Sequence, residues 1–123
     1  MRKVTLGGKE IALRASPLAL LFYRQAFGKD LIADLVSLQS LQGLAKGDFS
    51  GLDTLLLLQI AYAMHRAAKP GTNFPGFEQW LGELEYIDFG DTDWIMGVAE
   101  EAVEGFFRSA GSAAPPATKS KKK

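Results

Sequence analysis

Apolar and polar residues alternate along the first part of the chain, which is the pattern of half-buried β-strands. The alternating apolar positions are Val4, Leu6, Ile11 and Leu13. Gly7-Gly8 stands between the two runs and supplies the positive φ angles that a two-residue hairpin turn needs. The pattern therefore predicts a β-hairpin over residues 2–14, with an apolar face that other elements must cover.

The following apolar residues recur with the period of an α-helix, and turn residues mark where the helices begin and end. Ser16-Pro17 predicts a helix start, because serine caps helices well and proline fits the first turn. Gly28 predicts the end of that helix. Asp30 is the expected cap of a second helix, which we expect to end at Gly43 or Gly47.

The third helix is predicted from the run between Leu55 and Met64, which is apolar nearly all round. A helix of this kind is either central to a fold or shared with a partner. We expect Ser50 to cap it, with Asp53 three residues later, and Pro70-Gly71 to follow its end.

Two more helices complete the predicted domain. The fourth buries Phe77, Trp80, Leu81 and Leu84. The fifth begins near Asp91-Thr92-Asp93, where acidic residues suit the positive end of the helix dipole. It is expected to bury Trp94, Ile95, Val98, Ala99, Ala102, Val103 and Phe106, and to turn Glu100, Glu101 and Glu104 to water. The predicted fold class is therefore mainly α, with about five helices and an N-terminal hairpin in one domain over residues 1–111.

The last segment, residues 112–123, has a different composition from the domain before it. It holds Pro, Ala, Ser and Lys but no large apolar side chain, so it cannot bury enough surface to offset the entropy of ordering. We expect a disordered, basic tail. Lys121-Lys122-Lys123 is also what an A-rich slippery stretch of mRNA would encode, and a frameshift there would append a second domain. A plain solubilising tail is the alternative.

The residue inventory does not indicate catalysis. The chain has no cysteine, and its single histidine, His65, is expected to be solvated at a helix end. The acidic residues between Glu83 and Asp93 lack the ligand spacing of a calcium loop. We therefore predict no enzyme activity, no cofactor and no metal site. The longest apolar stretch is about half of what crosses a bilayer, so no membrane partner is expected either.

Charge is unevenly distributed although the net charge is zero. Residues 1–69 carry a net charge of +4, residues 70–111 carry −8, and the tail restores +4. This pattern can steer oppositely charged partners to different faces. The alternative is that the charges only keep the helices soluble. The tail lysines could contact phosphates, but no basic helix accompanies them, so a nucleic-acid partner is not favoured.

The supply of apolar residues is generous for one small domain, since the four leucines at 55–58 are joined by aromatic residues in and near the fifth helix. Phe107 lies about 100° round the helix from the buried stripe, and Phe89 falls in a loop. We predict a partner-binding surface on the last helix and the loop before it, and the alternative is that these residues complete the core. The predicted binding residues are Phe89, Trp94 and Phe107, flanked by Glu100, Glu101 and Glu104. The acids would select a basic or amphipathic helix.

The order and spacing of these segments resemble the tail assembly chaperones of long-tailed bacteriophages and prophages, especially those of Gram-positive hosts. The resemblance covers roughly residues 2–105. The segments that carry it are Phe22-Tyr23-Arg24-Gln25-Ala26-Phe27-Gly28, Asp30-Leu31-Ile32-Ala33-Asp34-Leu35, Ala61-Tyr62-Ala63-Met64-His65-Arg66-Ala67-Ala68 and Phe77-Glu78-Gln79-Trp80-Leu81.

The resemblance implies a non-enzymatic role. Proteins of this family coat the tape measure protein in the host cytoplasm while the tail tube polymerises, and they are absent from the finished virion. Many have a longer, frameshifted form whose extension recruits tail tube subunits. Self-association of this protein into rings or filaments is a further expectation. The alternatives are a small structural virion or connector protein, and a nucleic-acid-associated phage regulator that uses the lysine tail.

Overall fold

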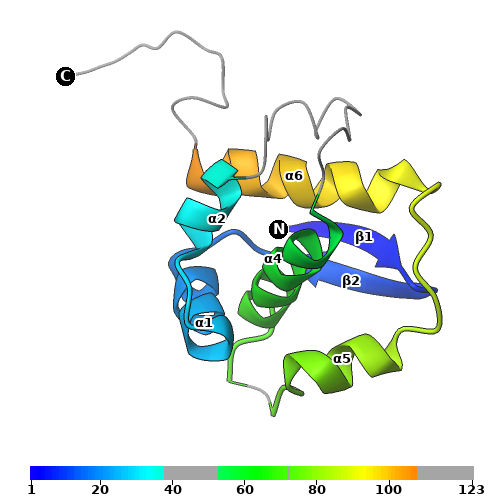
Figure 1. The fold of residues 1–123 in the computed structure, drawn as a ribbon, viewed down its shortest axis with the longest axis horizontal. Helices are drawn as coiled ribbons and strands as arrows, with labels where there is room; N and C mark the ends of the chain where they lie inside the picture. The colour runs from blue at the N-terminus through cyan, green and yellow to red at the C-terminus, as the bar shows by residue number, and fades with distance from the viewer. Residues whose placement is uncertain (38–52, 72, 108–123) are drawn as a thin grey trace, which may run out of the picture.

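A β-hairpin and five helices make up the part of the chain that the computed structural model describes, which is residues 1–37, 53–71 and 73–107 (Figure 1). The elements are β1 (Arg2–Leu6), β2 (Lys9–Leu13), α1 (Pro17–Phe27), α2 (Leu31–Ser37), α4 (Thr54–Ala67), α5 (Phe77–Glu83) and α6 (Thr92–Phe106). The prediction of a mainly α fold with an N-terminal hairpin is confirmed. The predicted tail, the expected end of the second helix and Ser50 lie outside the described residues.

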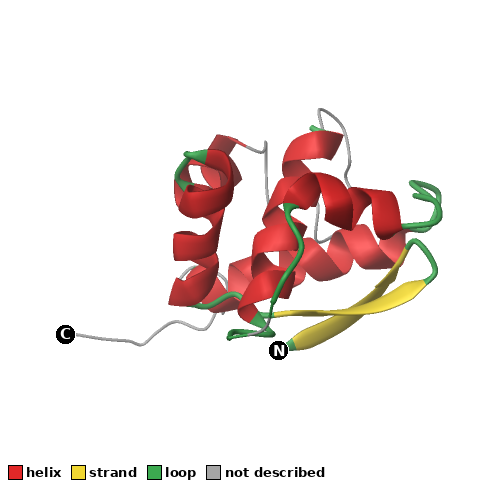
Figure 2. Ribbon diagram, turned by 90° about the horizontal axis from the view of Figure 1, so that it is seen from below, coloured by secondary structure: helices red, strands yellow, loops and turns green. Residues whose placement is uncertain are grey.

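The hairpin has the predicted turn and the predicted buried face. β1 and β2 are antiparallel, and Val4 pairs with Ile11. Gly7 and Gly8 have φ angles of 62° and 81°, which few other residues adopt without strain. The alternating apolar side chains of both strands are buried against the helices, and in Figure 2 the hairpin lies along one side of the helical layer.

Several helix ends are determined by residues next to them in the sequence. Gly28 ends α1 in the left-handed conformation, with φ 67°. The Asp30 side chain accepts a hydrogen bond from the Ile32 amide at 2.9 Å. Ser16 occupies the N-cap position of α1, but its side chain makes no capping hydrogen bond. The cap of α4 is Asp53, whose side chain accepts from the Leu56 amide at 3.1 Å, because this helix begins at Thr54.

α4 is the central helix, in contact with α1, β2, α5 and α6 (Figure 1). Most of its apolar side chains are buried, and Ile60, Ala63 and Met64 have no exposed surface, whereas Leu55 in its first turn is exposed. Of the two roles that fit an all-round apolar helix, the structure therefore shows the central one. No helix in the described ranges combines the length and the hydrophobicity that crossing a bilayer would require.

Aromatic rings hold α1, α4 and α5 together. The Tyr62 ring lies 5.4 Å from both the Phe77 and the Trp80 ring and 5.9 Å from the Phe27 ring, centroid to centroid. Its hydroxyl donates a hydrogen bond to the Pro75 carbonyl oxygen, which fixes the segment before α5. These edge-on contacts add to the energy of burial and give the end of α4 a rigid aromatic surround.

Candidate functional site

The six residues predicted to bind a partner are spread along the whole of α6. Phe89 lies before the helix begins and Phe107 lies at its C-cap. Because α6 has 15 residues, its ends are about 22 Å apart. The structure therefore does not bring these two rings onto one surface.

Trp94 belongs to the interior. Its side chain is 1% exposed, and its Nε1 donates a hydrogen bond to the Asp88 carbonyl oxygen at 3.0 Å. This burial confirms the prediction that the fifth helix buries Trp94, and it corrects the separate prediction that Trp94 is part of a partner-binding surface. The Trp94 ring instead lies beneath Phe89, with 5.5 Å between the ring centroids, and supports it.

All three glutamates of α6 make contacts within the domain, but only Glu101 contradicts the prediction that they face water, because the side chains of Glu100 and Glu104 are 41% and 67% exposed. Glu101 is buried, and its Oε2 accepts a hydrogen bond from the Ala15 amide at 3.0 Å. Arg2 of β1 forms ion pairs with Glu100 at 3.1 Å and with Glu104 at 2.7 Å. Glu101 is buried because the segment between β2 and α1 crosses α6 at this point. The buried backbone amide of Ala15 in that segment needs an acceptor, and the Glu101 carboxylate supplies it.

Phe107 is less exposed than the sequence predicts. It is partly buried and packed against the core, whereas the helical step of about 100° predicts an exposed ring. The step does not apply because Phe107 is the C-cap residue, with φ −129° and ψ 48°, and so leaves helical geometry.

The loop between α5 and α6 carries exposed aromatic side chains that the domain does not cover. Tyr86 is 56% exposed and Phe89 is 40% exposed. Phe89 was predicted from the sequence and Tyr86 was missed, because a tyrosine among loop acids follows no helical or strand period. We call residues 84–93, which are this loop and the first two residues of α6, the acidic aromatic loop.

Several contacts hold the acidic aromatic loop in place. It crosses the hairpin turn so closely that a Cβ on Gly7 would lie 2.7 Å from the Tyr86 carbonyl oxygen. The Asp88 side chain accepts from the Gly90 amide at 2.8 Å, and the Asp91 side chain accepts from the Asp93 amide at 3.2 Å. The exposed rings therefore stand on fixed backbone.

The acidic aromatic loop carries negative charge, which favours a cationic partner. Its charged residues are Glu85, Asp88, Asp91 and Asp93, and no lysine or arginine occurs between residues 70 and 107. A surface of this kind attracts cationic side chains and offers the two rings as apolar contact area. Within the described ranges, no three His, Cys, Asp or Glu residues are placed to hold a metal ion.

His65 lies in a different place from the solvated helix end that the sequence predicts. It is 8% exposed, and its Nδ1 is 2.8 Å from the Ala12 carbonyl oxygen. Since a carbonyl oxygen only accepts, Nδ1 carries the proton. Burial lowers the pKa of His65, the hydrogen bond to Ala12 partly opposes that shift, and the Lys69 charge adds to it.

This burial predicts that the domain loses stability as the pH falls. Above about pH 6.5 His65 is neutral in both states, and below it the unfolded chain takes up the proton first. The free energy of unfolding, measured with urea at pH 7.5 and 5.5, should therefore fall at the lower pH. In His65→Gln the fall should be smaller. An identical fall in both proteins would show that His65 does not cause it.

Comparison of the chain with protein families, with curated proteins and with solved structures finds no match.

Proposed function

We propose that this protein is a phage tail assembly chaperone, which binds and solubilises the tape measure protein while the tail tube assembles. The observation that carries the proposal is the acidic aromatic loop, with Tyr86 and Phe89 exposed on a fixed backbone. Aromatic side chains contribute much of the energy at protein interfaces, and rigid ones lose little entropy on binding. An amphipathic helix with apolar and basic residues is the partner that this surface fits.

The biological setting is part of the same proposal. The protein acts in the host cytoplasm and leaves before the virion is complete. A longer frameshifted form would recruit the tail tube protein through its extension. In this scheme the domain itself only binds the apolar helix of the partner reversibly, and it needs no catalytic group.

Co-expression with the tape measure protein tests the proposal. The wild-type chain should raise the soluble fraction of the partner, and the double variant Tyr86→Ser/Phe89→Ser should lose most of that effect. Removal of two interface aromatics weakens binding by about 10- to 100-fold. The free energy of unfolding of this variant should lie within about 1 kcal/mol of the wild-type value, because both side chains are substantially exposed.

The control is Leu21→Ser/Leu55→Ser, which removes two exposed apolar side chains from α1 and α4. This variant should keep the solubilising effect. If the partner is equally soluble with and without the wild-type chain, the chaperone proposal fails. Copurification of nuclease-sensitive nucleic acid, with no effect on the partner, would instead favour the regulator alternative.

A further inference from the structure

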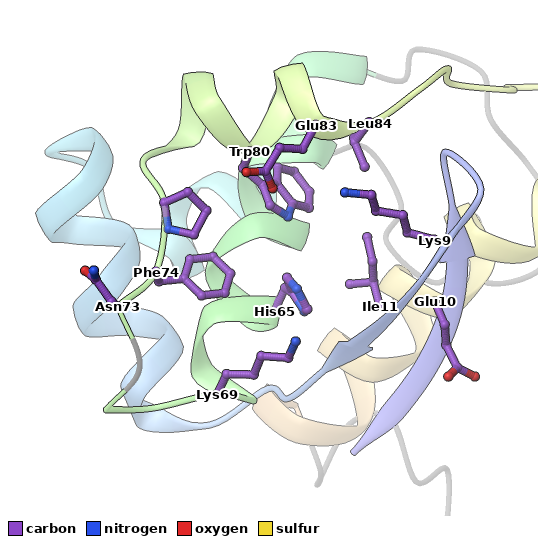
Figure 3. A pocket seen from close by; sticks show the side chains of 11 residues that line it. Lys9, Glu10, Ile11, His65, Lys69, Asn73, Phe74, Trp80, Glu83 and Leu84 are labelled. Carbon is purple, nitrogen blue, oxygen red and sulfur yellow. The ribbon is translucent and has the colours of Figure 1, made fainter.

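A cavity of about 400 Å³ opens between β2, the end of α4 and α5 (Figure 3). Its walls are mainly apolar and aromatic, and charged side chains stand at its rim. The residues used below are Ile11, His65, Phe74 and Trp80 of the walls and Lys9, Lys69 and Glu83 of the rim. Volumes of this size accommodate small organic groups or side chains.

The aromatic walls of the cavity are held firmly. The His65 and Phe74 ring centroids are 5.2 Å apart, and the His65 and Trp80 centroids are 6.2 Å apart. Behind them, the Tyr62 ring contacts both Phe74 and Trp80 and its hydroxyl holds Pro75. The cavity is therefore formed before any ligand arrives, which lowers the cost of binding.

An indole N–H faces this cavity. Trp80 is 4% exposed, and within the described ranges its indole N–H makes no hydrogen bond, whereas that of Trp94 does. Figure 3 shows the Trp80 nitrogen on the side of the ring nearest His65. Among the described residues the fully buried side-chain N and O atoms without a hydrogen-bond partner are Arg2 Nε and Ser16 Oγ, so water reaches the Trp80 N–H, and a ligand acceptor can take the place of that water.

The charged groups at the rim favour a negative ligand. The Lys9 and Lys69 ammonium groups reach toward the cavity from β2 and from the end of α4, whereas Glu10 points away from it (Figure 3). Glu10 and Glu83 both line the cavity, and Glu83 is the one whose carboxylate stands at the rim (Figure 3). The ammonium group of Lys9 and the indole N–H of Trp80 are donors on the cavity side, and such donors suit an acceptor with negative charge.

We propose that this cavity binds a carboxylate that is attached to a hydrophobic group, and that an acidic residue beside an apolar side chain of the partner protein supplies it. The apolar group lies between the Phe74 and Trp80 rings, and the carboxylate accepts from the Trp80 N–H and pairs with Lys9 and Lys69.

The source of the carboxylate rests on the proposed function and on the position of the cavity. Leu84 lines the cavity and begins the acidic aromatic loop. Tyr86 lies over Gly8, the residue before Lys9, since a Cβ on Gly8 would be 3.6 Å from the Tyr86 ring. A polypeptide that covers Tyr86 therefore reaches the cavity without a gap.

The first experiment uses N-acetyl-phenylalanine as the probe and its amide as the matched control, with ¹⁵N NMR detection. The chain has two tryptophans, so the Trp94 indole signal serves as an internal reference. The acid should shift the Trp80 indole signal saturably, and the amide should bind at least about fivefold more weakly. No saturable shift, or equal binding of acid and amide, would overturn the proposal.

Charge variants test the geometry of the same site. Lys9→Met and Lys69→Met should each weaken binding of the acid by up to about fivefold, and Glu83→Gln should strengthen it about twofold. Arg14→Met is the control, because Arg14 is exposed and does not line this cavity. If Arg14→Met weakens binding as much as Lys9→Met does, only the net charge matters and the site is wrong.

The second experiment measures capture of the tape measure protein. Lys9→Glu/Lys69→Glu should weaken capture about tenfold or more, and Arg14→Glu/Arg24→Glu, with the same change in net charge, should not. If the probe binds the wild type but Lys9→Glu/Lys69→Glu captures the partner normally, the partner is not the source and this inference fails while the chaperone proposal stands. If the wild type captures no partner, the proposed function fails, and the partner as source fails with it.

Discussion

Gly105→Ala should lower the free energy of unfolding by about 3 kcal/mol, although it adds only one methyl group. An ideal Cβ at Gly105 would lie 2.3 Å from the Ala15 Cβ and 2.6 Å from the Ala15 carbonyl oxygen. The chain between β2 and α1 crosses α6 at this point, and backbone atoms cannot rotate away as a side-chain end can. Urea denaturation of the variant and the wild type measures the loss.

The matched control for this prediction is Gly82→Ala in α5. A Cβ at Gly82 would meet no atom within 4 Å, so the alanine should stabilise the helix by about 0.5–1 kcal/mol. The two substitutions are chemically identical and differ only in what surrounds them. If both variants shift stability by the same amount, the close crossing at Gly105 is wrong. Ala15→Gly should rescue Gly105→Ala only in part, because the Ala15 carbonyl oxygen remains.

Glu101→Ala should destabilise the domain by about 2–3 kcal/mol, because it leaves the Ala15 amide without its acceptor and removes a partner of Arg2. Glu101→Gln retains an acceptor oxygen, so its loss should be smaller. Thermal and urea denaturation give both values.

The control for the second prediction is Glu104→Ala. Glu104 also pairs with Arg2, at 2.7 Å, but its side chain is 67% exposed, and exposed pairs contribute about 0.2–1 kcal/mol. A larger effect at Glu104 than at Glu101 would mean that the ion pair with Arg2, and not the buried hydrogen bond to Ala15, holds the hairpin on α6.

The elements that the sequence predicted well are those whose ends depend on neighbouring residues. Gly7-Gly8 allows only a narrow set of turns, Gly28 ends a helix by itself, and Asp30 caps through an amide two residues away. These signals act within a few positions, so periodicity and capping rules capture them. The cap of α4 was placed too early because Ser50 and Asp53 both satisfy the same local rule.

The predictions that were wrong concern which segment of the chain covers which face of a helix. Glu101 looks solvated on a helical wheel, yet its acceptor role comes from an amide 86 positions earlier. His65 is buried by a strand whose carbonyl oxygen is 53 positions away in the chain. Periodicity shows that a face exists, but it does not show what crosses that face.

The candidate site was predicted only in outline. An acidic, aromatic region near α6 could be expected from composition, and Phe89 was part of that expectation. Its real extent could not be predicted, because Tyr86 is placed by contact with the hairpin turn. The cavity beside it was missed entirely, since its walls come from β2, α4, α5 and the segment before α5.

The pairing of Arg2 with α6 also has a consequence for synthesis. Arg2 and Glu104 are 102 positions apart, so the first strand finds its permanent cover only when the last described helix has been made. Closing so long a loop costs little extra stability, since each doubling of length adds about 0.6 kcal/mol, but long-range contacts slow folding. Until α6 is made, the nascent chain carries Val4 without the contact that Gly97 of α6 provides, and a product terminated before α6 lacks that contact permanently.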